Sequence, residues 1–264
     1  MNDVTPILLL GAGRMGGALM DGWEKADAFN VVDLIVVDPN PSDALQATDA
    51  LVNPPTTYYS RALTVLLAVK PQIWRAAAEQ YGPLLAEDAV IVSIAAGVPE
   101  ADISAAFGGR RVARVMPTTA VSICKGTASI YASDEEARIR AHLLFDPVAT
   151  TVDLDDEALM HAATGVSGSA PAYLYAFVEA LEAAGVSAGL SPEASSQLAR
   201  ATIAGSAMLL DQSGEDPAEL RRQVTSPGGT TAEALKVLMG QGGLEPLLDQ
   251  AVAACIRRSR ELAG

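Results

Sequence analysis

Hydroxyl groups and glycines gather in one short stretch in the last fifth of the chain. It reads Val224-Thr225-Ser226-Pro227-Gly228-Gly229-Thr230-Thr231 and leads into an Ala- and Leu-rich helical pattern. The two glycines leave backbone amides uncovered, and a helix that begins after them adds the positive end of its dipole. The stretch therefore predicts an anion site of carboxylate size, in which Ser226, Thr230 and Thr231 offer directional hydrogen bonds.

An ordinary helix cap is the alternative use of this loop. Thr230 and Glu233 match the T-x-x-E capping box, in which the hydroxyl and the carboxylate would serve only the backbone. A second polar turn, at residues 167–171, precedes another helical pattern and is expected to open that helix in the same way. Two such helix N-termini could face one ligand.

A glycine-rich turn near the N-terminus offers a different chemistry. It lies between a short apolar run and a helical pattern and reads Gly11-Ala12-Gly13-Arg14-Met15-Gly16. In this G-x-G-x-x-G spacing the first glycine permits a tight turn, the second lets a pyrophosphate approach the backbone, and the third lets the helix pack closely on the strand. The turn predicts a dinucleotide site, and the alternative is a merely tight connection between strand and helix.

Asp38 ends the next apolar run, near the place where an acidic side chain bonds the adenosine ribose hydroxyls. A carboxylate there repels a 2′-phosphate, and no Arg or Lys occurs between Asp38 and Ser60 to neutralise one. The residue chemistry therefore favours NADH over NADPH. The alternative is that Asp38 caps a helix that starts at Pro39.

Two more segments fall at the carboxyl ends of predicted strands, where the ligands of open parallel sheets lie. They are Ala68-Val69-Lys70-Pro71 and Ala95-Ala96-Gly97, and we expect them to line the nicotinamide pocket. Lys70 is either a proton donor or a solvated or cofactor-contacting residue, since a lysine at a strand end serves any of these roles.

The elements that must position these groups differ between the two halves of the chain. Buried strands are predicted at Ile7 to Leu10, Leu34 to Val37, Val65 to Val69, Val90 to Ile94 and Val112 to Val115. Strands spaced by helices indicate parallel βαβ units. After Asp153 Ala-rich helical patterns take over. The sequence predicts an α/β protein with a dinucleotide-binding domain at residues 1–155 and an all-helical domain at residues 156–264.

The helical pattern at residues 171–184 is apolar on nearly every side. Tyr173, Phe177 and Leu181 form one row, while other apolar residues and alanines cover the remaining faces. A helix of this kind needs cover that a small domain does not supply, so we expect a homodimer or a higher homo-oligomer. A central helix in a monomeric bundle is the alternative.

Charge and composition narrow the classes of partner. The formal net charge of −14 repels phosphate backbones and anionic headgroups, so we expect small-molecule ligands and neither nucleic acid nor a membrane surface. No apolar run approaches the roughly 18 residues of a membrane span, and Asp3 stands where a signal peptide needs a base. Cys124 and Cys255 lack metal-ligand spacing, which predicts reduced thiols, no metal site and a cytoplasmic protein.

With these motifs in place, the chain resembles the pyrroline-5-carboxylate reductases over nearly its whole length. The resemblance rests on the turn at 11–16, Ala68 to Pro71, Ser93-Ile94-Ala95-Ala96-Gly97, Met116-Pro117, Ser167-Gly168-Ser169 with Pro171-Ala172, and Val224 to Thr231. It implies a Rossmann-like N-terminal domain followed by an all-helical dimerisation domain. It also implies NAD(P)H-dependent reduction of 1-pyrroline-5-carboxylate to L-proline, the last step of proline biosynthesis.

The resemblance assigns roles to individual residues. It implies that the loop amides hold the substrate carboxylate, that Thr231 hydrogen-bonds the ring nitrogen, and that Met116 and Pro117 contact the cofactor. Hydride then passes to the imine carbon while the nitrogen is protonated. Because this reaction needs orientation and one hydrogen-bond donor, His142 and His161 are expected to be structural.

The chain departs from the family pattern at two places. Thr118-Thr119-Ala120 stands where the family usually has Asn-Thr-Pro, and Ala170 stands where a glycine usually precedes Pro171. The family also more often uses NADPH, which opposes the interpretation of Asp38.

Two competing functions stay open at this point. One is a reductase of another imine or of a β-hydroxy acid. The enzyme acting on a β-hydroxy acid would need a catalytic Lys or Asp on the helical domain. There the helical pattern at residues 172–184 offers Glu179 and Glu182 but no lysine. The other is a non-catalytic nucleotide sensor, for which the altered residues 118–120 are the sequence support.

Overall fold

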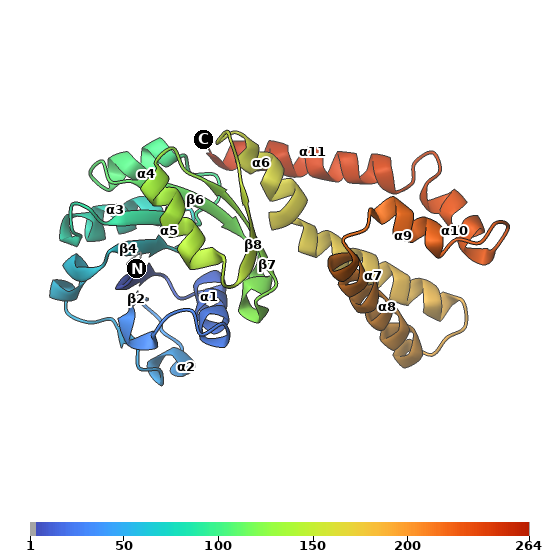
Figure 1. Ribbon diagram of the computed structural model, residues 1–264, viewed down its shortest axis with the longest axis horizontal. Coiled ribbons are helices and arrows are strands. Elements are labelled where there is room, and N and C mark those ends of the chain that lie inside the picture. Colours follow the sequence, from blue (N-terminus) through green and yellow to red (C-terminus); the bar gives the residue numbers. More distant parts are fainter. Residues whose placement is uncertain (1–3, 264) are drawn as a thin grey trace. The chain divides into compact units, whose positions relative to one another are not determined.

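The computed structural model describes residues 4–263, which form two compact units (Figure 1). The first unit runs to Gly168 and includes the segment from Cys255 onward, whereas the second unit is Ser169–Ala254. The helix at the end of the chain therefore begins in the second unit and ends in the first. No helix within residues 4–263 has the length and apolarity that a membrane crossing requires.

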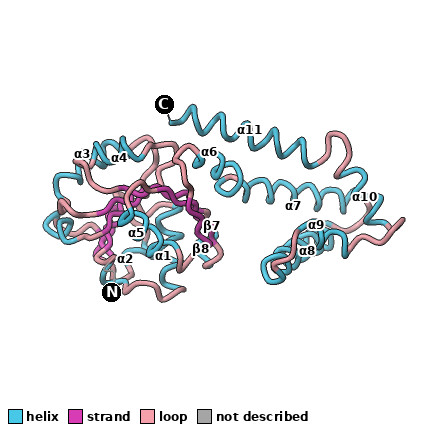
Figure 2. Tube along the Cα trace, turned by 45° about the horizontal axis from the view of Figure 1, so that its top comes forward, coloured by secondary structure: helices cyan, strands magenta, loops and turns pink. Residues whose placement is uncertain are grey.

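One sheet organises the first unit, and Figure 2 shows its strands side by side with helices on both faces. Within residues 4–263 its eight strands lie in the order β3-β2-β1-β4-β5-β6-β7-β8. Their bounds are β1 Ile7–Leu10, β2 Leu34–Val37, β3 Leu51–Val52, β4 Thr64–Leu67, β5 Val90–Ser93, β6 Val112–Pro117, β7 Gly126–Tyr131 and β8 Ala149–Asp153. The order reverses between β1 and β4, so the glycine-rich turn after β1 lies at the switch point where such sheets bind ligands.

Two layers of helices cover the sheet. The α-helices that lie wholly within the first unit are α1 Arg14–Lys25, α2 Asp43–Gln46, α3 Trp74–Tyr81, α4 Glu100–Ala106, α5 Glu135–Phe145 and α6 Leu159–Ala163. Because successive strand residues point to opposite faces, Leu9 packs with Trp23 of α1 and Phe145 of α5, whereas Leu8 packs with Trp74 of α3 and Ile103 of α4.

The predicted α/β class is confirmed, and so are most strand positions. β1 and β2 have the predicted bounds, and β4, β5 and β6 differ by one or two residues. The expectation of parallel pairing is confirmed for the five predicted strands. The additional strand β7 pairs antiparallel with β6. Strands β3, β7 and β8 were not predicted: β3 has two residues, β7 carries glycine, alanine and serine, and β8 is largely exposed.

The second unit is helical. It holds α7 Ala170–Ser187, α8 Pro192–Ser213, α9 Pro217–Gln223, α10 Thr230–Leu238 and the first part of α11 Leu244–Ala263. Within the single chain α7 has no buried residue, and Leu174, Tyr175 and Val186 are 44%, 67% and 42% exposed. Large apolar side chains of α8 and α10, Met208 and Val237 among them, are also exposed. This surface needs a partner to cover it.

Candidate functional site

The three glycines of the N-terminal turn meet three different constraints. Gly11 has a φ of +95°, and its N–H donates to Val37 O at 2.8 Å, which closes the turn after β1. A Cβ at Gly16 would overlap the carbonyl oxygen of Gly11, so the helix packs against the turn with no room for a side chain. A Cβ at Gly13 would meet no atom within 4 Å. Gly13 therefore leaves open space where a diphosphate could approach.

The first turn of α1 presents unused backbone donors. Gly13 is its N-cap residue, no side chain caps the helix, and no acidic residue occurs in its first turn. Because the first N–H groups of a helix have no partner within it, the amides of Arg14, Met15 and Gly16 can bind an anion. Arg14 and Gly13 are exposed, so an anion can reach these amides.

Asp38 follows β2 directly and its carboxylate reaches the glycine-rich turn. The N–H of Ala12 donates to Asp38 Oδ2 at 2.7 Å, and the N–H of Asn40 donates to Oδ1 at 2.8 Å. The next helix, α2, begins at Asp43 and is capped by the hydroxyl of Ser42. The alternative that Asp38 caps this helix is therefore wrong.

The remaining cofactor candidates lie at the same edge of the sheet. Ala68 to Pro71 follow β4, Ala95 to Gly97 follow β5, and Met116 and Pro117 end β6. Since β1, β4, β5 and β6 are parallel, their carboxyl ends meet at one edge. Gly97 has a φ of +78°, which favours glycine, and Lys70 is exposed. The structure thus brings these segments together with the glycine-rich turn.

Thr118, where the family usually has asparagine, is part of the β6–β7 connection. Its N–H donates to Thr127 O at 2.9 Å, and its Oγ1 accepts the N–H of Thr127 at 3.0 Å. The side chain is buried and fixes the register of this antiparallel pair. In this chain the position is therefore structural.

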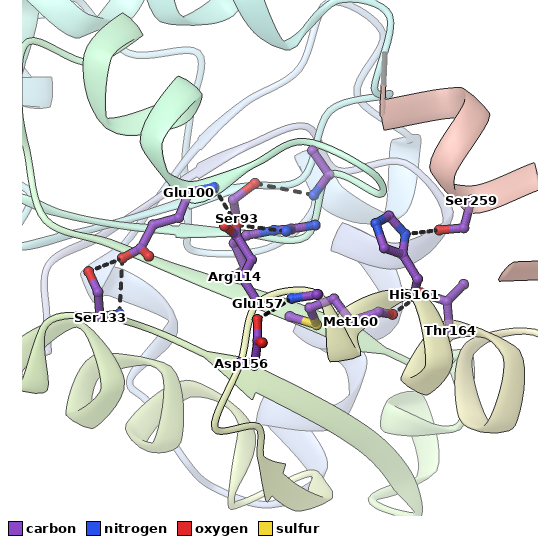
Figure 3. Close-up of polar contacts among 12 residues, drawn as sticks. Ser93, Glu100, Arg114, Ser133, Asp156, Glu157, Met160, His161, Thr164 and Ser259 are labelled. Carbon is purple, nitrogen blue, oxygen red and sulfur yellow. Dashed lines mark hydrogen bonds and ion pairs between the residues drawn. The ribbon is translucent and has the colours of Figure 1, made fainter. Parts of the chain in front are cut away.

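Arg114 of β6 and Glu157 form an ion pair that the sequence did not suggest (Figure 3). Arg114 of β6 has a side chain only 8% exposed, and its Nη1 lies 2.7 Å from Glu157 Oε1. The same oxygen accepts the N–H of Glu100, the first residue of α4, at 2.6 Å. Glu100 Oε1 in turn accepts the N–H and the hydroxyl of Ser133. The network joins β6, α4 and the segment before α6.

The two histidines contact polar groups within the first unit. His161 Nδ1 lies 2.9 Å from Ser259 Oγ, and burial together with the charges of Arg114 and Arg260 lowers the pKa of this imidazole. Burial also lowers the pKa of His142, but hydrogen bonds to Asp146 and Asp153 outweigh that effect and raise it above the ordinary value. These contacts agree with structural roles for both.

The loop before α10 is a tight turn that only glycine fits easily. The N–H of Gly229 donates to Ser226 O at 3.0 Å, with Pro227 and Gly228 as the central residues. Gly228 has a φ of +71°, and a Cβ at Gly229 would lie 3.1 Å from Ser226 O. This is the pattern of a type II turn, which needs a positive φ at its third residue. The turn delivers Gly229 as the N-cap of α10.

The predicted capping box is absent. Gly229 caps α10 without a side-chain hydrogen bond, and the carboxylate of Glu233 pairs with Lys236 at 2.6 Å. Within residues 4–263 the hydroxyls of Ser226, Thr230 and Thr231 have no hydrogen bond, whereas Thr225 Oγ1 donates to Arg221 O. The capping alternative is therefore wrong, and three hydroxyls beside unused amides are free to meet a ligand.

The second polar turn opens α7 as expected, with Ser169 as the N-cap residue and Pro171 in the first turn, but its geometry differs from that of the loop before α10. Residues 164–168 form a π-helical segment, and Ser167 Oγ donates to Ala163 O at 2.8 Å. Ser169 has right-handed helical dihedrals, and its side chain makes no capping hydrogen bond to α7. The glycine within this motif serves packing, because a Cβ at Gly168 would lie 3.3 Å from Met116 Sδ. The segment thus leads into α7 from a helical stretch and not from a glycine-rich turn.

Comparison with known proteins adds an independent observation. A family model described as pyrroline-5-carboxylate reductase dimerisation matches residues 157–262, and one described as NADP oxidoreductase coenzyme F420-dependent matches residues 6–97. Pyrroline-5-carboxylate reductase of Pseudomonas aeruginosa is 37% identical over 98% of this chain and 97% of its own length.

Two solved structures of this kind are similar to the chain over nearly its full length. A pyrroline-5-carboxylate reductase from Coxiella burnetii has a TM-score of 0.91 at 28% identity and covers 99% of this chain and 100% of its own. Plasmodium falciparum pyrroline carboxylate reductase with NADP bound has a TM-score of 0.86 at 25% identity, with 100% of both chains covered.

Proposed function

The chain belongs to the pyrroline-5-carboxylate reductase family, and we propose that its first unit holds the nicotinamide dinucleotide while the loop before α10 holds the imine. The protein is an NAD(P)H-dependent oxidoreductase that reduces 1-pyrroline-5-carboxylate to L-proline, the last step of proline biosynthesis. Its helical unit matches a dimerisation domain, so the protein is a homo-oligomer.

The residues at the sheet edge fit a dinucleotide. Open space at Gly13 and the unused amides of α1 suit a diphosphate, and Asp38 lies beside them for the ribose. Ala68 to Pro71, Ala95 to Gly97, and Met116 with Pro117 would line the nicotinamide. When bound, the reduced nicotinamide supplies the hydride.

One observation carries the assignment of the imine to the loop: three hydroxyls and a row of amides lie unused beside a turn that requires glycine. The amides of Gly228 and Thr230 face the substrate carboxylate, helped by the positive end of α10. Thr231 donates a hydrogen bond to the ring nitrogen, where the electron pair of the C=N bond collects when hydride adds to the carbon. The nitrogen takes a proton and the product is the cyclic amine.

The residues of the helical unit do not fit the alternative of an enzyme that acts on β-hydroxy acids. Residues 172–184 offer no lysine, and Glu182 is engaged, because Arg200 Nε lies 2.8 Å and Ser196 Oγ 3.0 Å from its Oε1. We also propose a cytoplasmic location, which agrees with a sequence that has no pattern of paired cysteines.

Turnover tests the assignment of the loop. Purified protein is mixed with 1-pyrroline-5-carboxylate, and absorbance of NADH and NADPH is followed separately for wild type, Thr231→Ala and Thr231→Ser. We expect Thr231→Ala to lower kcat/KM by about 10²-fold, the usual loss when one transition-state donor is removed, and Thr231→Ser to restore most of it. Equal kcat/KM in wild type and Thr231→Ala would remove Thr231 from the reaction. Cofactor binding without oxidation in wild type would instead favour the nucleotide sensor.

A further inference from the structure

The position of Asp38 is built by contacts from three segments. Besides the two amides that its carboxylate accepts, its own N–H donates to Asn53 Oδ1 at 3.0 Å, and its carbonyl accepts Asn53 Nδ2 at 2.9 Å. Asn53 has a φ of +47°, a conformation that asparagine tolerates better than most residues. The acid is thus fixed against both the glycine-rich turn and the segment after β3.

The carboxylate keeps capacity for a ligand. An ionised carboxylate has about four acceptor sites, and the amides of Ala12 and Asn40 occupy one on each oxygen. The hydrogen bond from Ala12 places Oδ2 directly at the glycine-rich turn. Because the adenosine ribose of a dinucleotide lies next to this turn at the end of β2, the unused sites suit its hydroxyl groups.

The charges around this position oppose an additional phosphate. Asp43 and Asp49 follow Asp38, and residues 38–60 contain no Lys or Arg. Arg61 is the first cation after them, and its guanidinium lies over the ring of Tyr58 at 5.3 Å from the centroid. A 2′-phosphate would therefore meet a fixed carboxylate. The neighbouring α1 has Arg14 in its first turn and Lys25 in its last turn, and Lys25 Nζ donates to Ser122 O.

We propose that Asp38 makes this enzyme prefer NADH to NADPH. Its carboxylate accepts a hydrogen bond from the 2′-hydroxyl of NADH and repels the 2′-phosphate of NADPH. The proposal rests on the proposed function, because it requires that the dinucleotide lies at this sheet edge.

Binding without substrate tests the preference. Dissociation constants for NADH and NADPH are measured by nicotinamide fluorescence on the full-length protein in its native oligomer. We expect wild type to bind NADH at least about tenfold more tightly, which corresponds to one well-placed interaction. Asp38→Ser keeps a hydroxyl that can accept from Ala12 but lacks the charge, and it should lower the preference at least about tenfold. Asp49→Asn is the matched control: it removes the same charge from an exposed residue and should leave the ratio unchanged.

Three results would overturn the proposal. Wild type that binds NADPH as tightly as NADH contradicts it directly. If Asp38→Ser weakens the binding of NADH and NADPH equally and leaves thermal unfolding unchanged, Asp38 only shapes the turn. Selective loss of NADPH binding in Arg14→Ala, in a wild type that prefers NADPH, would assign the phosphate to Arg14.

Turnover separates failure of the proposal from failure of the proposed function. Imine reduction that is faster with NADPH would support the proposed imine reductase function and contradict the preference for NADH. Tight and selective NADH binding without imine reduction would contradict the proposed imine reductase function and support the preference for NADH.

Discussion

The first unit buries its apolar side chains within the single chain, whereas the second leaves many of them exposed. Leu8, Leu9 and Phe145 of the first unit have no exposed surface, but Tyr175 of α7 is 67% exposed and Val237 of α10 is 77% exposed. The apolar core beneath the dinucleotide edge is therefore covered within one chain. The second unit, which carries the loop at 226–231, depends on a further subunit for cover.

The largest effect is expected at Gly16. Because a Cβ there would overlap the carbonyl oxygen of Gly11, Gly16→Ala must push α1 away from the turn. We expect at least about a 10²-fold loss of dinucleotide affinity, since the amides of the helix N-terminus no longer converge on the diphosphate. Gly17→Ala is the control, because its Cβ would lie 3.6 Å from Ala12 O, an ordinary contact. Equal affinity in the two variants, measured by NADH titration, would refute the packing argument.

Tyr175→Asp should weaken the association of subunits and leave cofactor binding by the first unit intact. A charge on the exposed face of α7 would be buried at a subunit contact, and we expect association to weaken at least about 30-fold, equivalent to a hot-spot loss of ~2 kcal/mol. Light scattering measures the mass, and NADH binding should change less than twofold. Val32→Asp, on an exposed apolar residue of the first unit, should leave the oligomer intact. A Tyr175→Asp protein that stays fully oligomeric would contradict the expected contact.

Arg114→Met tests whether the first unit depends on its ion pair. The variant leaves Glu157 without its cation, and we expect about 2 kcal/mol lower free energy of unfolding, less than for a fully buried pair because Glu157 is 30% exposed. The double variant Arg114→Met with Glu157→Gln should lose less than the sum of the two single changes. Additive losses in denaturant titrations would show that the two side chains do not interact.

The smallest effect concerns pH. The raised pKa of His142 contributes stability that is fully present below its unfolded pKa of about 6.5 and is lost as pH rises through the folded pKa. His161 has a lowered pKa, so its contribution is present above about pH 6.5 and is lost as pH falls. His142→Gln should therefore remove a Tm decrease that begins above about pH 6.5, and His161→Gln should change the slope in the opposite direction. Parallel Tm profiles for both variants and wild type would contradict this.

Local patterns predicted the elements whose burial is strongest. Ile7 to Leu10 and Leu34 to Val37 are short, fully apolar runs, and the structure gives both strands those bounds. β8 could not be found in this way, because it is largely exposed and lacks a continuous apolar run. The glycine-rich turn at 11–16 was predictable because its spacing is local.

Long-range or backbone-specific features escaped prediction. Arg114 pairs with Glu157, 43 residues away, and the only signal was a charged residue inside an apolar strand. The capping box failed because a positive φ at Gly228 brings the chain into α10 at Gly229, one residue before Thr230. The turn at 167–171 does open α7, but the π-helical segment before it was not predicted, because it depends on the bond from Ser167 back to Ala163.

The division of labour between the units is tested most directly with Thr231→Ala, by measuring the dissociation constant for NADH and kcat/KM for 1-pyrroline-5-carboxylate on the same preparation. If the sheet edge binds the cofactor and the loop binds the imine, NADH affinity stays within about twofold of wild type while kcat/KM falls about 10²-fold. A parallel loss of both, or unchanged kcat/KM, would contradict the division.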